Sequence, residues 1–351
     1  MSIFVSLASY RDDVCSSTLV DLYKKASNPL LVFVGICQQN HPDDLDCIQS
    51  TVPDEFLPNI RIIKLNHWEA KGPQIARYYC SKLWNNETYY LQIDSHTTFV
   101  QDWDIKCIKM INQLKSLGVS NKPVLSYYPK SFGTENDKSL DVPRMCKSFF
   151  NNRGMISFMG SESLPQTEIP YNTPHLASGF FFCESYFLNE LPYDPSLDYL
   201  FVGEEILHSA RFYTHGWDIF TPTENIVYHE YTRKEKPKIW TDLTYSDKDA
   251  LQKVKYLLGL SKNPPPEYIM NNVEKYGLGT TRSLSDFYNF AGIDIKSKTT
   301  FKNFCRINNI DDTYVAPKPN KKYYVYVFCI CLSFALIILL LLLLVLLPCK
   351  F

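Results

Sequence analysis

The chain has no excess of charge of either sign. Its 351 residues include 36 Lys and Arg and 37 Asp and Glu, for a formal net charge of −1. Without a basic excess there is little to draw the protein to a phosphate backbone, so we expect no nucleic-acid partner. Intrinsic disorder is excluded by a composition that is 45% hydrophobic and 15% aromatic. The composition predicts a folded chain with one large domain or two smaller ones.

Several common motifs are also missing. There is no GxGxxG, no Walker A loop and no GxSxG, so the dinucleotide-binding, P-loop and α/β-hydrolase signatures are excluded. The 11 cysteines are scattered, odd in number and contain no CxxC pair. We therefore expect neither a structural zinc site nor a disulfide framework, and a reducing compartment fits this pattern.

The two ends of the chain differ in character. The N-terminal stretch before Arg11 has no basic region and no long apolar core, so we expect no secretory signal. Tyr323–Leu347 carries no charged side chain and is long enough for a transmembrane helix, the alternative being a buried core helix. Lys321 and Lys322 precede it. These features predict a single-pass C-terminal membrane anchor with the catalytic domain facing the cytosol.

Strand and helix signals alternate along the first part of the chain. Helices are expected at 17–26, 74–84 and 204–214, and the expected strands are short apolar runs at 3–7, 30–37, 60–65, 89–93, 180–183 and 226–228. Such alternation is typical of an α/β fold, Rossmann-like, with a mostly parallel sheet. Ligands bind such sheets beyond the carboxyl ends of the strands. We divide the chain into a catalytic domain (1–234), a helical C-terminal extension (235–314), a linker (315–322) and the anchor (323–347).

One group of candidate residues has the chemistry of metal ligands. Asp94 and His96 follow an apolar strand, and His229 ends another. Carboxylate and imidazole together suit Mn²⁺, and carboxylate suits Mg²⁺. The alternatives are a solvated turn for the first pair and a structural histidine for His229.

A second group carries charge near expected strand ends or helix starts. Glu204 and Glu205 open a helix after a glycine, where they could act in catalysis or merely cap the helix. Arg11, Lys71 and Arg77 could contact phosphate or nucleotide, although each alone could be a surface charge.

Taken in order, several segments resemble one enzyme family, the cytoplasmic hydroxyproline polypeptide N-acetylglucosaminyltransferases. The segments are FVSLASYRD (4–12), AKGP (70–73), ARY (76–78), LQIDSH (91–96), ASGFFF (177–182), PYDP (192–195), FVGEE (201–205), AR (210–211), THGW (214–217), YH (228–229) and YGLGTTRSL (276–284). They span about residues 3–298. The same segments are more distantly similar to the mucin-type polypeptide N-acetylgalactosaminyltransferases.

The resemblance implies a GT-A fold, a UDP-sugar donor, a divalent metal (Mn²⁺ or Mg²⁺) and retention of anomeric configuration. It implies the following roles: metal ligands Asp94, His96 and His229; catalytic residues Glu204 and Glu205; and donor-binding residues Ser9, Arg11, Lys71, Arg77 and Arg233.

These observations predict a metal-dependent retaining glycosyltransferase that moves a sugar, expected to be N-acetylglucosamine, from a UDP-sugar to a hydroxyl on a protein. The alternatives are a transferase for another UDP-hexose or a non-protein acceptor, and a catalytically inactive, membrane-tethered binding scaffold.

Overall fold

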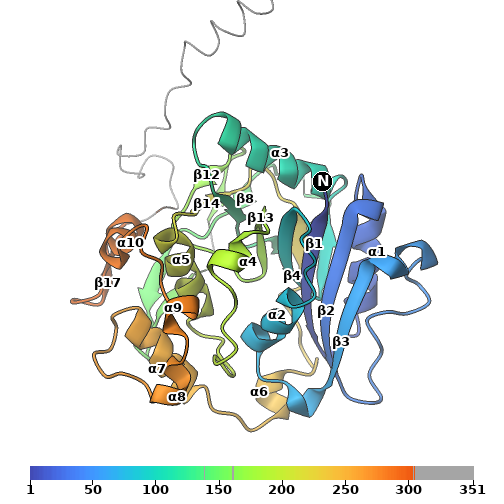
Figure 1. Cartoon of the computed structure of the whole chain (residues 1–351). Coiled ribbons are helices and arrows are strands. Elements are labelled where there is room, and N and C mark those ends of the chain that lie inside the picture. The colour runs from blue at the N-terminus through green and yellow to red at the C-terminus, as the bar shows by residue number, and fades with distance from the viewer. Residues whose placement is uncertain (138, 160–161, 303, 305–351) are drawn as a thin grey trace, which may run out of the picture.

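The computed structural model describes residues 1–137, 139–159, 162–302 and 304 (Figure 1). The helices of this part of the chain are α1 (Cys15–Lys25), α2 (Pro73–Ser81), α3 (Trp103–Ser116), α4 (Phe187–Glu190), α5 (Glu204–Thr214), α6 (Ile239–Asp242), α7 (Lys248–Leu257), α8 (Glu267–Met270), α9 (Val273–Tyr276) and α10 (Leu284–Ala291). Short 3₁₀ turns are η1 (Pro29–Leu31), η2 (Asp54–Asn59) and η3 (His67–Glu69).

The main sheet has eight strands in the order β12-β14-β6-β13-β4-β1-β2-β3. Their bounds are β1 (Ile3–Tyr10), β2 (Val32–Asn40), β3 (Ile60–Asn66), β4 (Tyr89–Asp94), β6 (Pro123–Ser126), β12 (Tyr171–Asn172), β13 (Phe180–Glu184) and β14 (Asp218–Thr221). The four strands from β4 to β3 are parallel, whereas β13 runs antiparallel to both its neighbours and β12 antiparallel to β14. The fold is therefore a mixed α/β fold, with a less uniformly parallel sheet than predicted.

Smaller sheets surround the main one. Their strands are β5 (Thr97–Phe99), β7 (Lys130–Ser131), β15 (Val227–His229), β8 (Val142–Pro143), β11 (Ser163–Leu164), β9 (Ser148–Phe150), β10 (Ile156–Phe158), β16 (Ile293–Asp294) and β17 (Thr299–Thr300). The sheet that matters for the site is β5-β15-β7, in which β15 runs antiparallel to β5.

Helices cover both faces of the main sheet, because successive strand side chains point to opposite faces and both sets are apolar. Val5 and Leu7 share one core with α1 and α3. Phe4 lies in a second core that includes Phe187 of α4 and Phe212 of α5. The continuous apolar strands are thus explained by burial on both sides.

The C-terminal helices lie beside α5 (Figure 1, orange). Ile206, Leu207 and Ala210 of α5 share a core with residues of α7 and α10. A buried ion pair joins Lys253 of α7 to Asp194, with 2.7 Å between nitrogen and oxygen. The domain boundary at residue 234 stays a prediction, and residues 305–314 of the extension and the linker 315–322 lie outside the described residues.

The expectation of a transmembrane anchor is corrected. Within residues 1–304, as far as the structure describes them, no helix combines the length and apolarity needed to cross a bilayer. The segment 323–347, on which the expectation rested, lies outside the described residues. A single-pass anchor, and with it a catalytic domain held at the cytosolic side of a membrane, is therefore not supported.

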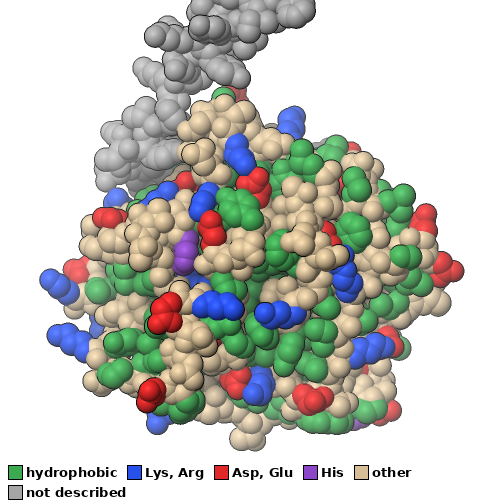
Figure 2. Space-filling model, in the orientation of Figure 1, with side chains coloured by type: hydrophobic (Ala, Val, Ile, Leu, Met, Phe, Trp, Pro, Cys, Tyr) green, Lys and Arg blue, Asp and Glu red, His purple; other side chains and the backbone are tan. Residues whose placement is uncertain are grey.

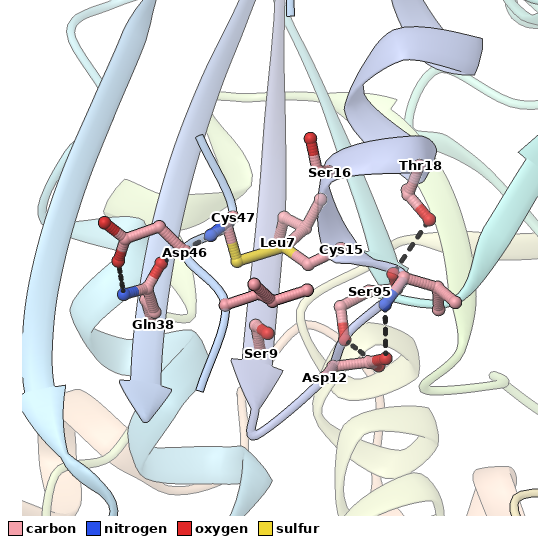
Figure 3. The surroundings of a disulfide bond; sticks show 12 residues. Leu7, Ser9, Asp12, Cys15, Ser16, Thr18, Gln38, Asp46, Cys47 and Ser95 are labelled. Atoms are coloured by element: carbon pink, nitrogen blue, oxygen red, sulfur yellow. Dashed lines mark hydrogen bonds between the residues drawn. A yellow bond between two sulfur atoms is a disulfide. The ribbon is translucent and has the colours of Figure 1, made fainter. Parts of the chain in front are cut away.

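The expectation that the scattered cysteines follow no disulfide pattern is corrected as well. Cys15, at the start of α1, is bonded to Cys47, in the segment after β2, and their Cα atoms are 4.9 Å apart (Figure 3). The spacing of the two cysteines does not indicate this bond, because tertiary packing brings them together. The reducing compartment inferred from the scattered cysteines loses its support.

We expect Cys47→Ala to lower the free energy of unfolding by about 3–4 kcal/mol. The bond joins residues 32 positions apart, and a cross-link of this span restricts the unfolded chain by roughly that amount. Urea unfolding without reductant measures the change.

The matched control is Cys107→Ala, which removes a buried free thiol of α3 and should cost only about 1 kcal/mol. The double variant Cys15→Ala/Cys47→Ala should be little less stable than Cys47→Ala, since one bond is lost in both. Equal losses for Cys47→Ala and Cys107→Ala would contradict a stabilising disulfide.

Candidate active site

A carboxylate and two imidazoles meet at the end of β4. Asp94 is the last residue of β4, and His96 follows two residues later, just before β5. His229 ends β15, where it pairs with Thr97 of β5. This pairing brings His229, which is far along the chain, next to the turn between β4 and β5. One potential ligand atom from each of Asp94, His96 and His229 lies within 4.8 Å of the others.

Asp94 is held in its charged form. Its Oδ2 is 3.0 Å from Nε2 of His229, and its Oδ1 accepts a hydrogen bond of 3.0 Å from Arg77. Burial alone would raise the pKa of Asp94, but the contact with His229 and the charge of Arg77 lower it well below its usual range. The carboxylate is thus in the form that binds cations.

Arg77 of α2 connects two carboxylates. Its guanidinium donates to Asp94 and to Oε1 of Glu204, the first residue of α5. Gly203, immediately before α5, has a φ of +106°, a conformation that glycine adopts without strain. Burial raises the pKa of Glu204, and the charge of Arg77 opposes that rise.

Glu205 lies beside this pair with hydrogen bonds of its own. Oε2 accepts from the Tyr128 hydroxyl at 2.7 Å, and Oε1 accepts from the backbone N–H of Ser178 at 3.0 Å. Burial raises the pKa of Glu205 to about 7, despite the lowering effect of these two hydrogen bonds. The carboxyl group therefore titrates near neutral pH.

A cavity of about 620 Å³ opens onto these groups. Of the predicted site residues, its walls include Arg77, Asp94, His96, Glu204, Glu205, His229 and Arg233. Tyr10 and Gln39, from the ends of β1 and β2, line another part, and Phe201 and Trp240 contribute exposed aromatic rings. The volume is in the range of small-molecule sites. On the face that Figure 2 shows, acidic and basic side chains are interspersed.

Three of the predicted donor-binding residues lie elsewhere. Ser9 is buried and does not line the cavity. Arg11 pairs with Asp44 at 2.8 Å and with Asp242 at 3.0 Å. Lys71 forms an exposed ion pair. Being near a strand end or helix start was not enough to predict the direction of these side chains.

The structure also adds residues that the sequence analysis did not single out. Asp12 accepts from Nδ1 of His96 at 2.7 Å and lies 3.5 Å from Arg233. Gly179 is so close to Asp94 that a Cβ there would lie 3.3 Å from Oδ2. Both residues lie in sequence segments that carry the family resemblance, and that resemblance was the only sign in the sequence that they belong to the site. Their contacts depend on tertiary packing.

The acidic and imidazole groups meet where β4 of the mixed main sheet and β15 of the small sheet end. The fold is similar to the crystal structure of GalNAc-T7 with UDP, GalNAc and Mn²⁺, with a TM-score of 0.52 and 13% identity over 82% of this chain and 54% of that chain. This chain thus spans about half of that one. The structure of S. aureus TarS 1-349 in complex with UDP-GlcNAc matches with a TM-score of 0.47 and 13% identity, over 76% of this chain and 69% of that one.

The family is shown by sequence. The model of the family described as Glycosyltransferase (GlcNAc) matches residues 2–57 and 53–297, and the chain belongs to this family. Among curated proteins, none matches the chain.

We expect Glu205→Gln to reduce the loss of stability that the wild type shows as pH rises. Burial raises the pKa of Glu205 in the folded chain to about 7, from its usual 4.5. The folded state therefore holds the proton more tightly, and the contribution to stability is present below pH 4.5 and lost as pH rises through 7. The difference corresponds to on the order of 3 kcal/mol. Urea unfolding at pH 4.5 and 8 measures it.

A glutamine at this position keeps an oxygen for the Ser178 N–H and can donate to Tyr128, so the local hydrogen bonds survive. Glu267→Gln, at an exposed residue of α8, is the matched control and should preserve the wild-type slope. The same slope in Glu205→Gln would show that Glu205 ionises normally.

Proposed function

We propose that this glycosyltransferase moves N-acetylglucosamine from a UDP-sugar to a hydroxyl group of a protein, with retention and with a divalent cation. The observation that carries the proposal is the juxtaposition of Asp94, His96 and His229 with the buried Arg77–Glu204 pair in one cavity. The description of the matching family supports the sugar. The fold shared with GalNAc-T7, whose structure contains UDP and Mn²⁺, supports the donor class and the cation.

The side chains fit a divalent cation. Asp94 is ionised, and its Oδ2 faces Nε2 of His229. Nδ1 of His96 is engaged by Asp12, which leaves Nε2 of His96 for a ligand. One carboxylate with two imidazoles is a donor set that Mn²⁺ accepts. When bound, the cation would supply Lewis-acid stabilisation of the leaving diphosphate.

The chain's own residues would position the donor. Arg233 and Lys238 are cations of the cavity wall and could pair with diphosphate oxygens. Glu204 is held by Arg77, so its orientation is coupled to that of Asp94. We assign Glu204 to holding the sugar and the acceptor near the anomeric carbon, where an oxocarbenium-like transition state develops positive charge.

The transfer needs no nucleophile from the protein, because the acceptor hydroxyl itself attacks the sugar. The acceptor oxygen would bond to the anomeric carbon while the bond from that carbon to the diphosphate oxygen breaks. Both bonds lie on the same face of the sugar, which retains the configuration. The acceptor proton would pass to the departing diphosphate.

We expect Asp94→Asn to reduce UDP release from UDP-N-acetylglucosamine by about 10²–10³-fold in the presence of Mn²⁺. The reason is loss of a charged ligand and with it of electrostatic stabilisation in the transition state. Release of UDP with and without an acceptor hydroxyl, at fixed protein concentration, measures the effect. A chelator should reduce wild-type release to a similar level.

Asp43→Asn is the control, because Asp43 is an exposed carboxylate outside the cavity lining. It should retain wild-type release. Full activity of Asp94→Asn, or of the wild type in chelator, would refute a cation-dependent transfer at this site. Release from a different UDP-sugar only would refute the assignment of N-acetylglucosamine.

A further inference from the structure

Asp12 is a buried carboxylate that the proposed function does not use. It lies in the short segment between β1 and α1 and is 3% exposed. Oδ2 of Asp12 accepts from the Ser95 hydroxyl at 2.6 Å and contacts Nδ1 of His96 at 2.7 Å. Arg233 lies 3.5 Å from the same oxygen, which is an ion pair rather than a close hydrogen bond. A buried charge is costly unless it is satisfied, and His96 is one of its closest partners.

The contact fixes the chemistry of His96. Oδ2 of Asp12 accepts from the Ser95 hydroxyl and lies 3.5 Å from the guanidinium of Arg233, so a donor and a cation stabilise the carboxylate beside His96. The ionised carboxylate can only accept hydrogen bonds, so Nδ1 of His96 must carry the hydrogen. A neutral imidazole has a single N–H, and its lone pair is then at Nε2. Nε2 is thereby left free to ligate.

The segment that carries Asp12 is firmly attached. The backbone N–H of Val14 donates to Oδ1 of Asp12 at 3.3 Å. Cys15 starts α1 and is tied to Cys47 by the disulfide, next to Asp12 and Ser95 (Figure 3). Asp12 is therefore held between β1, which is part of the main sheet, and the start of α1, which the disulfide fixes in place.

The opposite side of the contact is attached to the same helix. The hydroxyl of Thr18, in α1, donates to the backbone oxygen of Ser95 at 2.8 Å and accepts from the N–H of Thr97 at 3.1 Å. The turn that contains His96 thus cannot shift independently of the helix beside Asp12. The carboxylate of Asp12 and the imidazole of His96 are therefore both held in place through contacts with α1.

We propose that Asp12 is a positioning residue for the cation site, which selects the Nδ1–H tautomer of His96 and orients Nε2 toward Asp94 and His229. This inference rests on the proposed function, because it assumes a cation at those residues. It adds a residue outside the ligand set and assigns it an action through one ligand. Carboxylates that bind the second nitrogen of a ligating histidine commonly raise metal affinity by 10–100-fold.

The test is Mn²⁺ binding by the full chain, measured by the loss of the electron paramagnetic resonance signal of free Mn²⁺, with and without UDP. We expect Asp12→Asn to weaken Mn²⁺ binding by 10–100-fold. Circular dichroism at the same temperature verifies that the variant is folded during the titration. His96→Ala should weaken binding as well, and Asp12→Asn/His96→Ala should bind no more weakly than His96→Ala alone, because Asp12 acts through His96.

Two variants control for structural effects. Asp13→Asn removes a neighbouring carboxylate that pairs with Lys236 instead, and Ser95→Ala removes another partner of Asp12 while leaving the contact with His96. Both should bind Mn²⁺ within about twofold of the wild type, whereas a general loosening of the loop would weaken Ser95→Ala as well.

The outcomes separate the inference from the function on which it rests. Wild-type affinity in Asp12→Asn, or losses that add in the double variant, would overturn the role of Asp12 and leave the transferase intact. A wild-type protein that neither binds Mn²⁺ nor releases UDP would overturn the proposed function itself, and the role of Asp12 with it.

Discussion

The arrangement of the site depends on the buried guanidinium of Arg77, which lies between two carboxylates. Arg77 comes from α2, Asp94 from the end of β4 and Glu204 from the start of α5, so the interaction joins three distant segments. Burial disfavours the charge of Arg77, but the two carboxylates outweigh this effect and raise its pKa. Removal of any one member would leave uncompensated buried charge, which costs several kcal/mol. The same contacts that stabilise the fold therefore hold the end of β4 and the start of α5 at one cavity.

Much of the fold could be predicted from local sequence pattern. Apolar runs of strand length indicated β1 to β4, and the helix expected at 204–214 has the bounds of α5. The direction of β13 could not be predicted, because a strand buried on both faces has the same apolar pattern whether it runs parallel or antiparallel. The expected anchor rested on residues outside the described chain, where apolar composition was the whole argument.

Site residues could be predicted where they lie at the end of a strand. They could not be predicted where their role depends on the direction of the side chain. Asp94 and His229 both end strands, and the pairing of β5 with β15 brings them together. Arg11 directly follows β1, but its guanidinium pairs with Asp44 and Asp242. Asp12 is the converse case, since its importance comes from contacts formed only after β1, α1 and the β4 turn have packed. The disulfide escaped prediction for the same reason.

The ion pair between Lys253 and Asp194 has a consequence for modularity. Lys253 belongs to α7, and α7 and α10 cover the side of α5 that faces away from the main sheet. A chain that ends at residue 234 would lack Lys253, so the buried charge of Asp194 would lose its partner. The apolar side of α5, the helix that begins with Glu204, would be exposed to solvent. The C-terminal helices therefore cannot be exchanged or deleted as an independent module, and Glu204 and the extension should unfold as one cooperative unit.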